Sequence, residues 1–298
     1  MTRISRRQLL MLSSAVVCLA CGSDKVIPPP SGGFNGQIEV RYASDITPEV
    51  HNAVTLAVAK WTRALSKNMG DFPLNSAANH CFVDEPQLSE THHNLLLFVT
   101  VTPIDGLNGQ LAYTEICSLS DRDTLPILSH IRLDRADVDS MVARGVLDDV
   151  LVHEMGHALG FVPTSYMPKA LTAGGTDDPR FVGAVAQSEF AKHGAWYTGA
   201  RVPLENSAGV GPRDPHWRFT VFGDELMVSV VGPGFKSPLS SITLGLFRDL
   251  GYTVDFSQAD PYEVAPLFGD NRVVPETSLR NDVVRTKAPT FVSPVAAY

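Results

Sequence analysis

The chain has 298 residues, of which 44% are hydrophobic and 19% charged, and its formal net charge is −8. This composition excludes a wholly disordered chain, a collagen and a coiled coil, and the length suffices for a full hydrophobic core. The acidic balance argues against a nucleic-acid partner, and no apolar run is long enough for a transmembrane helix in the mature protein.

Residues 1–20 have the pattern of an export signal. Three arginines precede the apolar segment Leu9–Ala20, which is too short to cross a bilayer but typical of a signal peptide. The sequence SRRQLL at Ser5–Leu10 resembles a twin-arginine signal, and a general export signal that happens to carry two arginines is the alternative. We therefore expect an exported protein of the cell envelope or surface.

Cys21 lies in the sequence LACGS, which resembles a bacterial lipobox, although Cys18 stands where that pattern has an aliphatic residue. A lipid on Cys21 would be the protein's one attachment to a membrane, on the periplasmic side or in the outer membrane, and secretion without a lipid is the alternative. Residues 21–36 are rich in Pro, Gly and Ser, which is typical of a flexible tether.

Two cysteines, Cys81 and Cys117, lie outside the leader. Export places them in an oxidising compartment, where paired cysteines form disulfides. We therefore expect one Cys81–Cys117 disulfide, with two buried free thiols as the alternative.

Hydrophobic periodicity predicts both strands and helices in the remaining chain. The predicted strands are 37–42, 95–104, 110–117 and 130–133, and the predicted helices are 47–66, 146–159 and 240–250. Residues 161–215 are rich in Gly, Pro and polar residues and are expected to form a long irregular insertion. Because strands and helices do not alternate strictly, the pattern favours an α+β fold.

The segment His153-Glu-Met-Gly-His157 carries the strongest chemical signal. Residues i and i+4 share one face of a helix, so His153 and His157 can bind one metal ion, while Glu154 can reach a water beside it. The pentapeptide also arises by chance, but here the surrounding helix is apolar on most of its surface. Buried His and Glu side chains need a partner that compensates for their desolvation, and a zinc ion provides one.

The residues after this segment narrow the choice of a third ligand. Gly160 permits a sharp turn where the helix ends, but Pro163 stands where a short metzincin motif has its third histidine. His193 and His216 are the later histidines, and we interpret His193 as a surface residue. A carboxylate ligand, with Glu189 as the candidate, is the alternative.

The motif around His153, the long insertion, His216-Trp217, Glu225-Leu-Met227 and the segment 239–252 together resemble the leishmanolysin family of zinc metallopeptidases. This resemblance implies that His216 is the third zinc ligand and that Met227 forms the Met-turn below the metal. It also implies a metzincin-like fold with an N-terminal catalytic subdomain (37–162), containing a twisted mixed sheet, a backing helix and the active-site helix. An irregular C-terminal subdomain (163–298) would follow.

The resemblance further suggests that the strand near Gly109–Tyr113 is an exposed edge to which an extended peptide can add. The predicted function is hydrolysis of protein or peptide bonds by metal-activated water, with one Zn²⁺ ion and Glu154 as general base. The alternative is an exported lipoprotein that binds peptides through an inactive metalloprotease fold. Cleavage preference and oligomeric state stay open.

Overall fold

The computed structural model describes residues 38–174, 177–194, 199–206, 215–231, 236–264, 279–280, 289–293 and 295. The predicted signal peptide (1–20), the lipid-anchor residue Cys21 and the tether (21–36) lie outside these residues and stay predictions. Among the described residues, no helix is both long and apolar enough to cross a bilayer.

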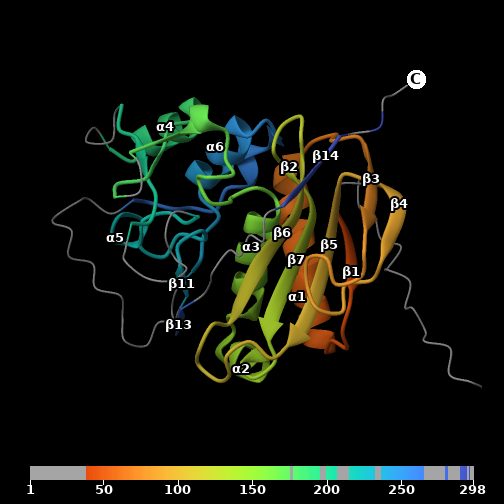
Figure 1. Cartoon of the computed structure of the whole chain (residues 1–298). Helices are drawn as coiled ribbons and strands as arrows, with labels where there is room; N and C mark the ends of the chain where they lie inside the picture. The colour runs from red at the N-terminus through yellow and green to blue at the C-terminus, as the bar shows by residue number, and fades with distance from the viewer. Residues whose placement is uncertain are drawn as a thin grey trace, which may run out of the picture. The chain divides into compact units, whose positions relative to one another are not determined.

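The largest sheet is mixed and has the strand order β1-β5-β7-β6-β14 (Figure 1). Strands β1, β5 and β7 run parallel, β6 runs antiparallel to β7, and β14 runs parallel to β6. The strands are β1 Ile38–Tyr42, β5 Leu95–Thr102, β6 Ala112–Ser120, β7 Pro126–Asp134 and β14 Thr290–Val292. A mixed sheet combined with several helices confirms the predicted α+β class.

Helices α1 (Pro48–Ala64) and α3 (Leu147–Ala158) lie together on one face of the sheet (Figure 1). On α1, the Thr47 side chain accepts a hydrogen bond from the Val50 amide, as expected for an N-cap followed by proline. Nearly every residue of α3 is buried, which agrees with its apolar sequence.

A tryptophan joins the two helices. The indole nitrogen of Trp61 on α1 donates a hydrogen bond to the main-chain oxygen of Val152 on α3, at 2.8 Å. The Trp61 ring also packs edge-on against Phe247, with 5.0 Å between ring centroids. Helix α1 therefore fixes the position of α3 against the C-terminal half of the chain.

The other face of the sheet is contacted by the hairpin of β3 (Asp71–Ser76) and β4 (Leu88–His93). In the loop between these strands, the Phe82 ring stacks on His130 of β7 at 3.9 Å. The same loop contains the predicted disulfide, Cys81–Cys117, which joins it to β6.

The segment 161–215 is less irregular than predicted. It contains α4 (Ala184–Ala191), which packs so closely on α6 (Ser241–Asp249) that a Cβ on Gly245 would lie 2.8 Å from the Ala186 Cα. Because backbone atoms make this contact, the sequence of α4 shows no amphipathic pattern. The remaining elements are short: β2 Leu65–Ser66, α2 Val138–Arg144, η1 Lys169–Leu171, β8 Thr172–Ala173, β9 Arg180–Phe181, β10 Val202–Pro203, α5 Phe219–Phe222, β11 Val230–Val231, β12 Thr253–Val254, η3 Phe256–Gln258 and β13 Leu279–Arg280.

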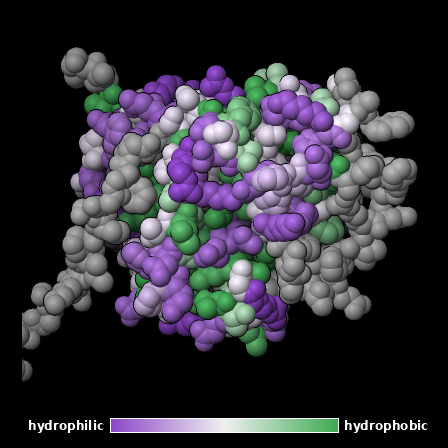
Figure 2. All heavy atoms as spheres, turned by 180° about the vertical axis from the view of Figure 1, so that it is seen from behind, coloured by the Kyte–Doolittle hydropathy of each residue, from purple (hydrophilic) through white to green (hydrophobic). Residues whose placement is uncertain are grey.

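The face opposite to that of Figure 1 carries hydrophilic and hydrophobic side chains interspersed with one another (Figure 2). Exposed large apolar side chains are scattered in sequence, among them Leu56 on α1 and Val142 on α2. Single exposed apolar residues are normal for folded proteins and identify no binding surface.

Candidate metal centre

Helix α3 places the residues of the H-E-x-x-H segment in the interior of the protein. His153, Glu154 and His157 are each at most 1% exposed. The imidazole rings of His153 and His157 stand one helical turn apart, with ring centroids 4.7 Å from each other. Three ionisable side chains buried this deeply require a compensating partner.

His216 approaches the same point from far along the chain. Its Nε2 atom lies 3.2 Å from the Nε2 of His157, which is 3.0 Å from the Nε2 of His153. Among the described residues, these three histidines form the one group of His, Cys, Asp or Glu side chains whose ligand atoms all lie within 4.8 Å of one another.

The donor set suits zinc. Tetrahedral Zn–N bonds of about 2.0–2.1 Å place two nitrogen ligands about 3.3 Å apart, close to the separations found here. Three neutral imidazoles around one ion also leave a fourth tetrahedral position for water or a substrate atom, as in catalytic zinc sites.

Main-chain carbonyls orient two of the imidazoles. His153 Nδ1 lies 2.6 Å from the Leu226 oxygen, and His157 Nδ1 lies 2.5 Å from the Phe161 oxygen. In each pair the carbonyl accepts, so the proton resides on Nδ1 and the lone pair of Nε2 faces the other histidines. Such contacts fix the tautomer that a metal ligand needs.

The segment around His216 is held by main-chain bonds on both sides. The Glu205 amide donates to the His216 oxygen at 2.8 Å, and the Trp217 amide donates to the Met227 oxygen at 2.9 Å. The Trp217 indole nitrogen donates to the Thr243 hydroxyl at 2.7 Å. The rigid neighbours of His216 thus come from three separate parts of the C-terminal half.

Met227 is fully buried and packs against α3 between the two histidines of the motif. A Cβ added to Gly156 would lie 2.7 Å from Met227 Sδ and 3.1 Å from the Trp61 ring. Glycine at position 156 therefore allows Met227 to approach the helix backbone. A glycine inside an otherwise regular helix indicates a close contact, and this is the signal in the sequence for the role of Gly156.

Glu225 is a further buried residue, and no local sequence pattern indicates its role. Its carboxylate accepts hydrogen bonds from the Met227 amide at 2.5 Å and from the Ser240 hydroxyl at 2.7 Å, and it also accepts one from the Thr243 hydroxyl. Burial raises the pKa of Glu225 to about 7, although these hydrogen bonds lower it in part. Glu225 thus links the Met227 turn to the first turn of α6.

Glu154 contacts the neighbouring strand β6. The Thr114 hydroxyl lies 2.7 Å from Glu154 Oε2 and 2.9 Å from the Glu154 main-chain oxygen, and it can donate to either. The carboxylate is therefore held on the side of α3 that faces β6.

Gly160 occupies the turn after α3. Its φ of +131° lies in a region that L side chains rarely adopt, and a Cβ there would meet Leu125 and Leu250 at 3.2 and 3.3 Å. Tyr252, the first tyrosine after Met227, donates its hydroxyl to the Leu159 oxygen at 2.8 Å. It therefore stabilises the end of α3, and burial raises its pKa.

Two alternative ligands lie outside the triad. Glu189 on α4 binds Lys192 Nζ at 2.6 Å. His193 was interpreted as a surface residue, but its side chain is 10% exposed and its ring packs against Tyr262. It is covered because the segment 262–264 lies over it, and the Val264 amide donates to its Nδ1.

Two further acidic residues are buried outside the metal centre. Asp134 and Asp137 are at most 1% exposed. They accept the amides of Asp105, Gly106 and Asn108 and so fix the loop before β6. At the start of α3, burial raises the pKa of Asp149 to about 6.

The three histidines form a candidate metal site, and the comparisons with known proteins identify a family of metallopeptidases. The family model described as leishmanolysin matches residues 85–267, more than half of the chain. The chain therefore belongs to the leishmanolysin family, which is zinc-dependent.

The curated relatives share only about a quarter of their aligned residues with this chain. Leishmanolysin of Leishmania major is 26% identical over 190 residues, which cover 60% of this chain and 30% of the relative. Leishmanolysin of Leishmania donovani is 25% identical over 200 residues (62% and 32%), and a leishmanolysin homolog of Crithidia fasciculata is 25% identical over 175 residues (56% and 26%). The chain thus spans about a third of the length of these relatives.

Proposed function

We propose that this protein is a zinc-dependent endopeptidase that hydrolyses peptide bonds of proteins or peptides. The observation that carries the proposal is the convergence of three buried Nε2 atoms, from His153, His157 and His216. The buried carboxylate of Glu154 is on the same helix, α3, as two of these histidines. Membership of the leishmanolysin family supports the same reaction class. Met227 is the proposed Met-turn residue, since it lies against α3 at Gly156.

His153, His157 and His216 would hold the ion. When bound, zinc supplies a Lewis acid that lowers the pKa of water to about 7 and polarises the substrate carbonyl. Glu154 accepts the proton of the attacking water and returns it to the leaving amine as the peptide bond breaks. Thr114 orients the Glu154 carboxylate for both transfers.

The substrate segment is proposed to lie in extended form along β6. Thr114 on this strand contacts Glu154, so a peptide paired with β6 would carry its scissile bond past the carboxylate. Main-chain pairing of this kind accepts many sequences, which fits an enzyme that acts on proteins.

A digestion experiment tests the proposal. The purified chain is incubated with casein and with a quenched fluorescent peptide, before and after treatment with 1,10-phenanthroline, and zinc is then added back. We expect cleavage that the chelator abolishes and zinc restores, with one zinc per chain by elemental analysis. A zinc-loaded chain that cleaves neither substrate would favour the peptide-binding alternative.

We also propose that residues 1–20 direct export and that Cys21 carries a lipid. The support is the sequence pattern alone. Mass spectrometry of the mature N-terminus is expected to show an acylated Cys21, and an unmodified N-terminus would reject the anchor.

A further inference from the structure

The C-terminal strand β14 lies on the edge of β6, the strand that contacts Glu154. Thr290, Phe291 and Val292 pair in parallel with Ser118, Leu119 and Ser120. The Thr290 hydroxyl lies 2.7 Å from that of Ser118, and the Asp121 amide donates to the Val292 oxygen at 3.2 Å. The chain's own C-terminal region therefore fills part of the edge.

The contacts continue beyond the strand on both of its neighbours. The Ser293 hydroxyl donates to the Asp121 carboxylate, and the Val295 amide donates to the Asp71 oxygen of β3 at 2.6 Å. Strand β14 is thus fixed to β6 and to the hairpin of β3 and β4, rather than resting on a single partner.

A bulge in β6 separates the covered part of the edge from the rest. The pairing with β7 shifts register between Ile116 and Ser118, which leaves Cys117 as the extra residue. The disulfide to Cys81 fixes this position. On the edge of β6 away from β7, no strand of the described part of the chain pairs with Thr114–Ile116. The pairing with β14 starts at Ser118, which lies opposite Thr290.

The reacting groups lie level with the part of the edge that β14 does not pair. Thr114 contacts Glu154, and Ile116 pairs with Ser129, whose hydroxyl donates to the Ala158 oxygen at 3.3 Å. The turn of α3 from Glu154 to Ala158 is therefore level with Thr114–Ile116. A peptide on this edge would meet β14 about two residues beyond that level, since a strand advances about 3.3 Å per residue.

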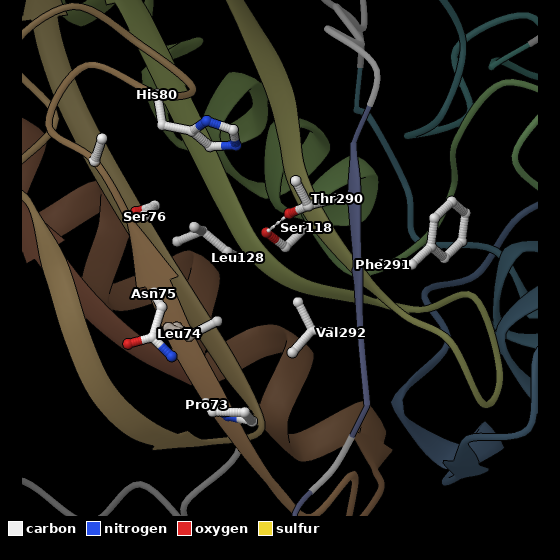
Figure 3. A pocket seen from close by; sticks show the side chains of 11 residues that line it. Pro73, Leu74, Asn75, Ser76, His80, Ser118, Leu128, Thr290, Phe291 and Val292 are labelled. Carbon is white, nitrogen blue, oxygen red and sulfur yellow. Dashed lines mark hydrogen bonds between the residues drawn. The ribbon is translucent and has the colours of Figure 1, made fainter.

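The close-up in Figure 3 shows how β14 occupies its place. Thr290 and Val292 point into a cavity of about 290 Å³ between β14 and β3, while Phe291 points away from it. Phe291 is 59% exposed. Strand β14 therefore closes the edge as a separate segment with open space behind it, rather than as a fully packed core strand.

Resting on the proposed function, we infer that β14 is a built-in stop that limits how many substrate residues can lie on one side of the scissile bond. Where β14 holds β6, no substrate strand can pair. The enzyme accepts long substrate extensions only on the other side of the scissile bond. Its specificity therefore depends on the distance of the scissile bond from one peptide end, as well as on the substrate side chains.

The test compares the full chain with a variant that lacks residues 289–298, and with a control that lacks residues 296–298 and keeps β14. A set of equal-length peptides carries one cleavable sequence at successive positions from end to end, and mass spectrometry identifies the bond cut. We expect the full chain and the control to cut within about two residues of one peptide end. Removal of β14 should raise cleavage at internal bonds about tenfold, because two or three new main-chain hydrogen bonds become available.

A second variant guards against misfolding of the deletion. Thr290→Pro with Val292→Pro removes two amide hydrogens from β14 and keeps the chain length, and circular dichroism checks the fold of each form. Equal cleavage of terminal and internal bonds by the full chain would overturn the inference, as would an unchanged pattern in both folded variants.

Binding separates this inference from the proposed function. Fluorescence anisotropy with the Glu154→Gln background measures affinity for labelled peptides extended at one end or the other. We expect the full chain to bind one of the two extended peptides about tenfold more weakly, and the difference to vanish without β14. If no form cleaves any peptide, the proposed function fails, but the binding measurement still decides the role of β14. Equal affinities of the full chain for the two extended peptides would overturn the inference about β14.

Discussion

Met227 packs so closely against Gly156 that a side chain at position 156 would force the methionine to shift: a Cβ on Gly156 would lie 2.7 Å from Met227 Sδ. The contact lies between His153 and His157 on the same helix. The contact therefore joins the stretch of α3 between the two histidines to the segment that contains Met227.

Gly156→Ala should destabilise the protein by about 1–3 kcal/mol through overpacking, although alanine is the better helix former by about 1 kcal/mol. Denaturant unfolding and zinc content measure the effect. The double variant Gly156→Ala with Met227→Ala provides the control, because removal of the methionine side chain returns the space. Additive losses in the double variant would contradict the contact.

Glu154→Gln should retain zinc and lose about 10²–10⁴ in cleavage rate, since the amide cannot accept the proton. Rates are measured with the quenched peptide at equal metal content. Glu189→Gln is the matched control and is expected to keep full activity, because Glu189 pairs with Lys192 away from the triad. Unchanged activity in the Glu154 variant would remove this carboxylate from the mechanism.

His216→Ala should lose most of the bound zinc after dialysis against a weak chelator, because two imidazoles remain where three converge. Elemental analysis gives the stoichiometry. His193→Ala is the control, a histidine of the same half of the chain that contacts Tyr262 instead, and it should keep one zinc. Equal zinc content in the two variants would exclude His216 as a ligand.

Glu225 should make stability depend on pH. Burial raises its pKa from 4.5 to about 7, so its protonated form is favoured in the folded state. The resulting stability is fully present below pH 4.5 and is lost as the pH rises through about 7, by about 3 kcal/mol in total.

Glu225→Gln mimics the protonated form, so its unfolding free energy relative to the unsubstituted protein should increase by about 3 kcal/mol between pH 5 and pH 8. Denaturant unfolding at both pH values measures this difference. Glu225→Ala, which leaves the Met227 amide without its acceptor, should be less stable by about 1–3 kcal/mol at pH 5. A difference between the Gln variant and the unsubstituted protein that stays constant with pH would contradict the shifted pKa.

Replacement of Cys81 and Cys117 by alanine should lower the unfolding free energy by about 4 kcal/mol, the entropic estimate for a disulfide that closes a loop of this length. Unfolding under oxidising and reducing conditions measures the loss. The reduced unsubstituted protein serves as the control and should match the double variant. A change below about 1 kcal/mol would show that the bond contributes little.

The sequence predicts the helices that carry the chemistry because their signals are local. Thr47 and Pro48 mark the start of α1, and the apolar surroundings of His153 and His157 identify α3 as buried. The family resemblance then pointed to His216, which no local pattern could select. The structure brings all three histidines together.

Other features depend on contacts that no local pattern contains. Strand β7 begins at Pro126, four residues before the predicted start, because proline and serine obscure its first half. Strand β14 is held by Ser118 and Asp71 rather than by its own propensity. The roles of Gly156 and Glu225 likewise arise from segments that meet only after folding.

The separation of 59 residues between His157 and His216 has a consequence for the growing polypeptide. A nascent chain that ends between residues 157 and 215 possesses the motif on α3 but neither His216 nor Met227. The proposed zinc site is therefore incomplete until residue 216 has been synthesised, so hydrolysis by the proposed mechanism cannot begin earlier in translation.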